Sequence, residues 1–124
     1  MLVSGGFTFF TERVSRALGF HFHESNILEI KNGTLTGEVL EPIRDKYSKL
    51  TCLESHAKSR KLRHEEVLAV GDGANDLPML QAAGLGVAFY AKPTVQQKAN
   101  ARVNHTDLTA LLYAQGYHKD EFRV

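Results

Sequence analysis

The chain has 124 residues, of which 43% are hydrophobic and 23% charged, and its formal net charge is +1. This size fits one domain or a piece of one, and the near-zero charge gives no reason to expect a nucleic-acid partner. The one cysteine, Cys52, excludes an internal disulfide framework. No apolar stretch could span a bilayer and no secretory leader is visible. We therefore expect a cytoplasmic protein without a membrane partner.

The first half of the sequence predicts a strand, two helices and a hairpin. A short apolar run at residues 1–3 ends in Ser4-Gly5-Gly6, and apolar residues at helical spacing predict a helix over residues 7–18, with Gly19 at its C-cap. Asn32-Gly33 between two strand-like runs predicts a hairpin. A second helix is expected around residues 47–57. The apolar positions of the first helix are Phe7, Phe10, Val14, Ala17 and Leu18. The aromatic side chains Phe7, Phe9 and Phe10 are expected in the core.

The second half predicts strands that alternate with helices. Residues 67–70 and 86–89 are short apolar runs of the kind found in buried parallel strands. Helices are expected over residues 77–83, from Pro93 to about Ala99, and from Thr106 or Asp107 to Gly116. The fold class is therefore α/β, with a doubly wound, mainly parallel sheet and one antiparallel hairpin. We expect residues 1–116 to form this core and residues 117–124 to be a tail.

The stretch from Gly71 to Leu80 is the most informative part of the sequence. It places Asp72 and Asp76 four residues apart where a buried strand ends, at the sheet edge where open α/β proteins bind ligands. Hard carboxylate oxygens on a short turn suit Mg²⁺, which keeps its other positions for water and phosphate. The competing interpretation is a plain strand-to-helix turn with Asp76 as a helix cap.

Two further elements carry a weaker signal for an anion site. Ser4-Gly5-Gly6 offers a hydroxyl and main-chain amides before a helix, although the same tripeptide is common in loops. Lys49 lies early in the second predicted helix, where most lysines are solvated charges. Each element alone predicts little.

Taken together and in this order, these elements resemble the haloacid dehalogenase superfamily of phosphatases, and within it the phosphoserine phosphatase group. Val3 to Thr8 matches the second motif of that group, Lys49 matches the third, and Gly71 to Leu80 matches the fourth. The Asn32-Gly33 hairpin and the segment from Gly84 to Phe89 also fit. The resemblance implies a Rossmann-like core and extends from Leu2 to about Leu112.

The resemblance also implies roles for individual residues. Ser4 and the Gly5 amide would hold the phosphoryl oxygens, Asn75 would contact the phosphate, and Lys49 would neutralise charge on the phosphate and the nucleophile. Phosphoryl transfer depends mainly on such donors and positive charges around the phosphate oxygens.

For the metal, the resemblance implies Mg²⁺ with ligands at the fourth motif. Asp72 would bind the ion, and Asp76 would support the metal site from behind Asp72. Lys49 and Asp72 are therefore the candidate catalytic residues of this chain.

The first motif of the family, an Asp-x-Asp pair that supplies the nucleophile and the acid/base, does not occur in this sequence. The aspartates are Asp45, Asp72, Asp76, Asp107 and Asp120. By the resemblance, the first-motif strand would lie at the sheet centre between the strands that end near Ser4 and Asp72, and a cap would follow it. Without that strand, both neighbours would have unpaired edges, which favour aggregation. We therefore expect the C-terminal portion of a larger enzyme, completed by an N-terminal half or a second copy.

The leading hypothesis is thus part of a Mg²⁺-dependent phosphomonoester hydrolase. The resemblance implies that the whole enzyme converts O-phosphoserine and water to serine and phosphate through an aspartyl-phosphate, the last step of serine biosynthesis. The alternative is a non-catalytic phosphate-binding or regulatory module that kept the anion site. A P-type ion pump shares the Gly-Asp-Gly-x-Asn-Asp signature, but Ser4-Gly5-Gly6-Phe7 and the lack of a membrane segment argue against it.

Overall fold

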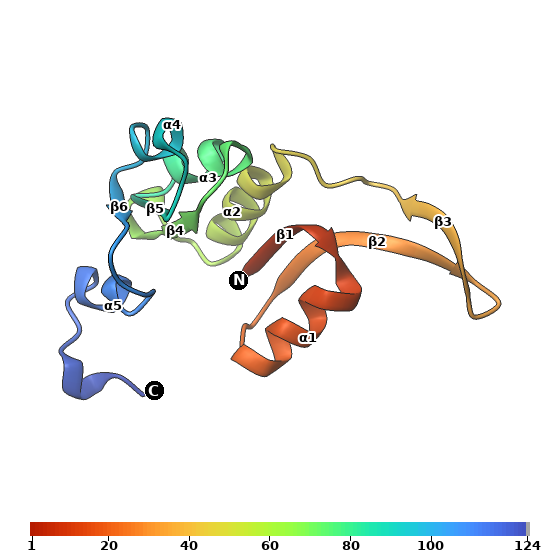
Figure 1. Ribbon diagram of the computed structural model, residues 1–124, viewed down its shortest axis with the longest axis horizontal. Coiled ribbons are helices and arrows are strands. Elements are labelled where there is room, and N and C mark those ends of the chain that lie inside the picture. The colour runs from red at the N-terminus through yellow and green to blue at the C-terminus, as the bar shows by residue number, and fades with distance from the viewer. Residues whose placement is uncertain (124) are drawn as a thin grey trace. The chain divides into compact units, whose positions relative to one another are not determined.

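Residues 1–123 are described by a computed structural model (Figure 1). The chain divides into two compact units, one from Met1 to Arg63 and one that begins at His64. None of the helices in residues 1–123 is both long and apolar enough to cross a membrane.

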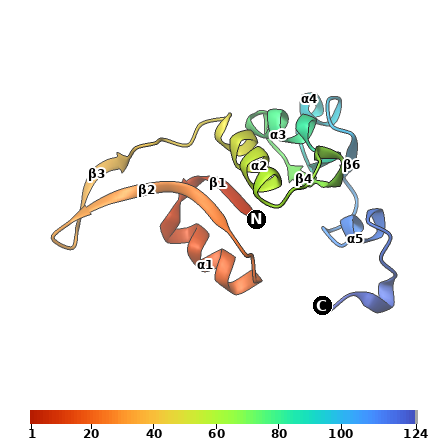
Figure 2. The same ribbon diagram turned by 180° about the vertical axis from the view of Figure 1, so that it is seen from behind.

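The first unit is a three-stranded sheet with two helices. Its elements are β1 (Leu2–Phe7), α1 (Thr8–Leu18), β2 (His23–Lys31), β3 (Thr34–Leu40) and α2 (Ser48–Ser59). β1 and β2 are parallel, whereas β2 and β3 are antiparallel and form the predicted hairpin. Asn32 and Gly33 have φ angles of 52° and 77°, as the tight two-residue turn of a hairpin requires. The turn end of this hairpin extends beyond α1 in both views (Figures 1 and 2).

The side chains that α1 buries differ from those expected. Thr11 and Ser15 are each 5% exposed, whereas Phe10 is 63% and Leu18 71% exposed. The polar side of the helix faces β2, where Thr11 Oγ1 lies 2.7 Å from Ser25 Oγ. The expectation that the aromatic residues of this segment are core was therefore wrong for Phe9 and Phe10. No other element of residues 1–123 buries their rings.

The second unit is a parallel three-stranded sheet with short helices. Its elements are η1 (His64–Glu66), β4 (Leu68–Gly71), η2 (Ala74–Asp76), α3 (Leu77–Ala82), β5 (Leu85–Phe89), α4 (Pro93–Gln96), β6 (Ala101–Val103), α5 (Ala110–Ala114) and η3 (Lys119–Glu121), where η marks a 3₁₀ turn. Leu80, Val87 and Val95 are its most deeply buried large side chains. α3 packs against β4 and β5, so the fourth-motif turn rests on the core of this unit.

Two helix boundaries in the second unit differ from the sequence expectations, and one strand was not predicted. The helix at Pro93 ends at Gln96. Asn100 then pairs with Gly86 and leads into β6, a strand that was not predicted. The last helix begins at Ala110 rather than near Asp107. In the expected tail, the ring of Phe122 contacts that of Tyr113 at a centroid distance of 4.9 Å. The tail boundary at residue 116 stays a prediction, and Val124 lies outside the described residues.

The strand order confirms the mainly parallel α/β sheet with a hairpin. The two sheets have the orders β1-β2-β3 and β4-β5-β6. β1 and β4 are therefore both edge strands within residues 1–123, as expected for a chain that lacks the first-motif strand. An unpaired edge presents N–H and C=O groups to any strand that can add to it.

Candidate active site

The fourth-motif turn is organised around the carboxylate of Asp76. Asp76 Oδ2 accepts hydrogen bonds from the main-chain N–H groups of Asp72 at 2.9 Å and Gly73 at 3.0 Å. The Asp76 side chain is only 2% exposed. It therefore fixes the main chain of Asp72 where β4 ends, while its expected support of a metal ion stays a prediction.

The two glycines of this turn are required for space rather than for a positive φ. A Cβ at Gly71 would lie 2.5 Å from the Cβ, Cγ and Oδ2 atoms of Asp76, and a Cβ at Gly73 would lie 2.5 Å from Asn75 Oδ1. Gly73 itself has an extended backbone, with φ −110° and ψ 164°. Any larger residue at either position would displace a side chain of the predicted site.

Asp72 and Asn75 lie on the outside of the same turn, and both are exposed. No cluster of three or more His, Cys, Asp or Glu side chains in residues 1–123 has the geometry of a metal site. A hard divalent cation held by one or two carboxylates, with water at its other positions, fits the exposed carboxylate of Asp72.

Ser4 and Gly5 lie within β1 rather than after it. The strand continues to Phe7, with a break in its register against β2 between Val3 and Phe7. Within this break Ser4 Oγ accepts the N–H of Gly6 at 3.0 Å, which leaves the hydroxyl proton of Ser4 available for donation. A Cβ built on Gly5 meets nothing within 4 Å. The open space beside Gly5 is consistent with close approach of a ligand.

Lys49 is the second residue of α2 and is half-buried. The segment before it is a tight turn in which Asp45 Oδ1 accepts the N–H groups of Tyr47 at 2.8 Å and Ser48 at 3.1 Å. In return, Ser48 Oγ accepts the N–H of Asp45 at 2.9 Å. These hydrogen bonds, that from Tyr47 first, hold the pKa of Asp45 below its ordinary value. The turn thus fixes where α2 begins, and with it the position of Lys49.

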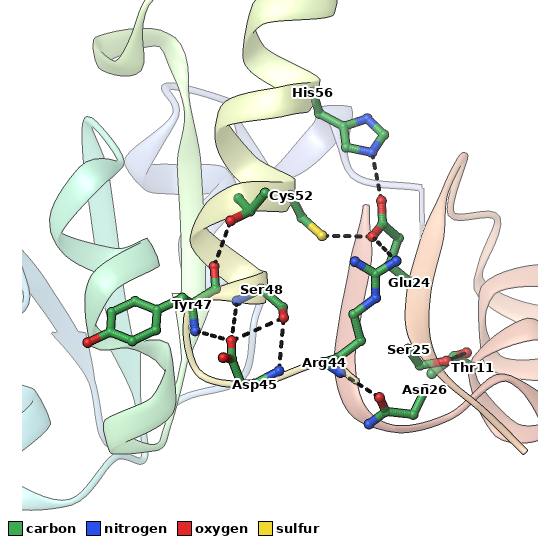
Figure 3. A network of polar contacts seen from close by, with 11 residues as sticks. Thr11, Glu24, Ser25, Asn26, Arg44, Asp45, Tyr47, Ser48, Cys52 and His56 are labelled. Carbon is green, nitrogen blue, oxygen red and sulfur yellow. Dashed lines mark hydrogen bonds and ion pairs between the residues drawn. The ribbon is translucent and has the colours of Figure 1, made fainter. Parts of the chain in front are cut away.

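A polar network that was not predicted from the sequence connects β2 to α2. Glu24 accepts a hydrogen bond from Cys52 Sγ at 2.9 Å and forms ion pairs with Arg44 at 3.2 Å and His56 at 3.5 Å. Figure 3 shows these side chains around Glu24. The Cys52 hydrogen bond, followed by Arg44 and His56, lowers the pKa of Glu24. Burial, followed by the contact with Glu24, raises the pKa of Cys52 to about 12. Cys52 is 3% exposed and is therefore a packing residue.

Each unit carries its own share of the predicted site residues. Ser4, Gly5 and Lys49 belong to the first unit, while Asp72, Asn75 and Asp76 lie on one turn of the second. These six positions were predicted from the family resemblance of short sequence motifs, and their roles stay predictions. The local sequence pattern could not find Glu24, Asn26 or Arg44, because their partners are distant in the sequence.

Comparison with solved structures relates the chain to phosphoserine phosphatases. A structure of a probable phosphoserine phosphatase from Vibrio cholerae, in unliganded form, has a TM-score of 0.85 and 42% identity, covering 89% of this chain and 34% of that one. A phospho-aspartyl intermediate analogue of phosphoserine phosphatase has a TM-score of 0.80 and 39% identity, covering 90% of this chain and 54% of that one.

Comparison with curated sequences also relates the chain to phosphoserine phosphatases. The phosphoserine phosphatase of Streptomyces coelicolor is 45% identical over 120 residues, which are 97% of this chain but only 29% of that relative. The chain thus spans about a third of the length of such a relative. The family model described as haloacid dehalogenase-like hydrolase matches residues 7–114, well over half of the chain. The chain therefore belongs to the haloacid dehalogenase-like hydrolases.

Proposed function

We propose that this chain supplies the phosphate-binding and metal-binding part of a phosphoserine phosphatase. The observation that carries the proposal is the fourth-motif turn, in which buried Asp76 holds the main chain and leaves the carboxylate of Asp72 exposed. The identity of 45% with a phosphoserine phosphatase across 97% of the chain supports the substrate assignment. The reaction is hydrolysis of O-phosphoserine to serine and phosphate.

The proposed roles follow from the chemistry of each side chain. The Ser4 hydroxyl and the Gly5 N–H donate to phosphoryl oxygens, and the Lys49 ammonium neutralises the charge that gathers on the phosphate and the nucleophile. Asn75 adds an amide donor to the phosphate. All four groups stabilise the transferring phosphoryl group without forming a covalent bond to it.

For the metal we propose Mg²⁺, held by the carboxylate of Asp72. When bound, this ion supplies positive charge to the phosphoryl oxygens and the nucleophile. Asp76 acts through Asp72, because its hydrogen bonds fix the backbone from which the Asp72 side chain projects. The remaining ligands of the ion would be water, phosphate and a group from outside these residues.

The nucleophile comes from outside this chain in our proposal. No Asp-x-Asp pair occurs in the 124 residues, and the solved phospho-aspartyl analogue of a relative supports an aspartate as the phosphoryl acceptor. The segment that carries it is an N-terminal half of the enzyme, because a second copy of these 124 residues would bring no Asp-x-Asp pair. The edge strands β1 and β4 each offer such a segment a place to pair.

The test is Mg²⁺-dependent release of phosphate from L-phosphoserine. It is run with the 124-residue chain alone and with the chain mixed with the Asp-x-Asp segment of a relative. We expect no release from the chain alone and release from the mixture. Lys49→Ala should lower that release by about 100-fold or more, while Lys46→Ala, at an exposed lysine three residues earlier, should not. Asp72→Asn should abolish the response to Mg²⁺.

Other outcomes would contradict this assignment. Equal turnover of unrelated phosphomonoesters would rule out the serine substrate. Release by the chain alone, abolished by Lys49→Ala, would place an unrecognised nucleophile within these residues. Saturable phosphate binding that survives Asp72→Asn, with no turnover in the mixture, would favour the non-catalytic module instead.

A further inference from the structure

The side chain of Asn26 connects two segments that carry proposed phosphate-binding residues. Its Nδ2 donates to the carbonyl oxygen of Gly5 at 2.9 Å, and its Oδ1 accepts the N–H of Arg44 at 2.6 Å. Asn26 is 8% exposed, and Figure 3 shows it beside the main chain of Arg44. A carbonyl only accepts and an N–H only donates, so these two partners fix the orientation of the amide. Asn26 thus joins the end of β1 to the segment that leads into α2.

Alternation along β2 explains why Asn26 reaches this segment. Successive side chains of a strand point to opposite faces, and Ser25 accordingly contacts Thr11 of α1. Glu24 and Asn26 share the other face, where Glu24 contacts Arg44 and Cys52. Two neighbouring positions of one strand therefore hold the chain on both sides of Lys49.

The connection from Arg44 to Lys49 is short and internally bonded. Asp45 and Ser48 hydrogen-bond to one another's main-chain N–H groups, and α2 begins at Ser48. A displacement of Arg44 would therefore move the first turn of α2 rather than be absorbed by a flexible loop. The position of Lys49 relative to Gly5 depends on Asn26 through this turn.

We propose that Asn26 is a positioning residue that sets the spacing between the Ser4-Gly5 anion site and the Lys49 ammonium group. The proposal rests on the proposed function, because it takes these three residues to hold one phosphoryl group. Asn26 touches neither substrate nor metal in this proposal. Its effect on catalysis comes from geometry, since misplacing a catalytic group by about 1 Å can cost about 100-fold in rate.

The test compares Asn26→Ala and Asn26→Asp with Ser25→Ala in the chain mixed with the Asp-x-Asp segment. Ser25 is the matched control, because it is an adjacent polar residue on the same strand, is 5% exposed and faces away from Gly5 and Arg44. We expect Asn26→Ala to lower kcat by about 10-fold or more and to weaken inhibition by inorganic phosphate to a similar degree. Ser25→Ala should leave both near the unsubstituted values.

Asn26→Asp adds a readout that a purely structural role would not produce. The carboxylate introduced by N26D can accept the N–H of Arg44 but opposes the carbonyl of Gly5, whereas its protonated form can make both hydrogen bonds. The activity of N26D, divided by that of the unsubstituted protein at the same pH, should therefore rise as the pH falls. The same ratio for Asn26→Ala should stay flat.

The results separate this inference from the proposed function. If the unsubstituted mixture is active and Asn26→Ala behaves as Ser25→Ala does, the positioning role is wrong. If the mixture is inactive but the chain binds inorganic phosphate, a loss of that binding in Asn26→Ala and not in Ser25→Ala would still support the spacing argument. If neither turnover nor phosphate binding is found, both proposals fail.

Discussion

The carboxylate of Asp76 accepts a hydrogen bond from the main-chain N–H of Asp72 at 2.9 Å. The two aspartates of the fourth motif are therefore unlike in their surroundings, although they are alike in sequence. Asp76 is 2% exposed and bonded to the main chain, while Asp72 is exposed. One carboxylate shapes the turn and the other remains available to a ligand.

Replacing these two aspartates should accordingly have unequal effects on stability. Asp76→Ala removes the acceptor of two hydrogen bonds, and hydrogen bonds to a charged group contribute roughly 1.5–3 kcal/mol each. We expect a loss of about 2–4 kcal/mol in the free energy of unfolding, measured by urea denaturation. Asp72→Ala should change it by less than about 0.5 kcal/mol. An equal loss in the two variants would contradict the division of roles.

Gly71→Ala tests the space beside Asp76. The added Cβ would lie 2.5 Å from three atoms of the Asp76 side chain, which cannot move away without breaking its hydrogen bonds to Asp72 and Gly73. We expect a loss of roughly 1–3 kcal/mol, as for other overpacked sites. Gly5→Ala is the control for stability, because its Cβ meets nothing within 4 Å. Thermal unfolding followed by circular dichroism measures the difference. Equal melting temperatures for the two variants would show that the space beside Asp76 is not limiting.

Cys52 should resist alkylation in the folded protein. Its side chain is 3% exposed and its thiol donates to Glu24, and its pKa is raised to about 12, so little thiolate forms at neutral pH. We expect iodoacetamide at pH 8 to leave the folded chain unmodified and to modify it fully in urea, as read by mass spectrometry. Modification of the folded chain at the rate of a free thiol would show that this network opens.

The order of most strands and helices could be predicted because each of these is marked by its local sequence. Asn32-Gly33 predicts the hairpin. The segment from Gly71 to Leu80 contains the end of a strand and the turn after it, and its sequence matches a motif of one protein family. The three-residue strand β6 could not be predicted, since Ala101–Val103 is too short to show a period. It is positioned by Asn100, which pairs with Gly86.

The surroundings of α1 and the residues that hold α2 could not be predicted from the local sequence pattern. Periodicity shows that one side of α1 is apolar, but not what covers it, and the structure buries Thr11 and Ser15 instead. Asn26 and Glu24 bond to partners 18 and 28 residues away in the sequence. Such contacts depend on how β2 and α2 pack, so no sequence motif predicts them.

The ion pairs of Glu24 predict how stability changes with pH. The hydrogen bond from Cys52, with Arg44 and His56 nearby, lowers the pKa of Glu24 in the folded state below its ordinary value of 4.5. The unfolded chain therefore takes up a proton at this group before the folded chain does. The stabilisation is fully present above the ordinary pKa, and it is lost as the pH falls from there through the folded pKa.

Glu24→Gln removes this carboxylate and should flatten that dependence. We expect the variant to be less stable by about 1–3 kcal/mol at pH 7, because Arg44 loses its partner, and the difference from the unsubstituted chain should shrink as the pH approaches 3. Urea denaturation at several pH values measures it. Glu12→Gln is the control, since the pair of Glu12 with Arg16 is largely exposed and such pairs contribute little. A difference that stayed constant down to pH 3 would mean that Glu24 stabilises α2 by packing and not by its charge.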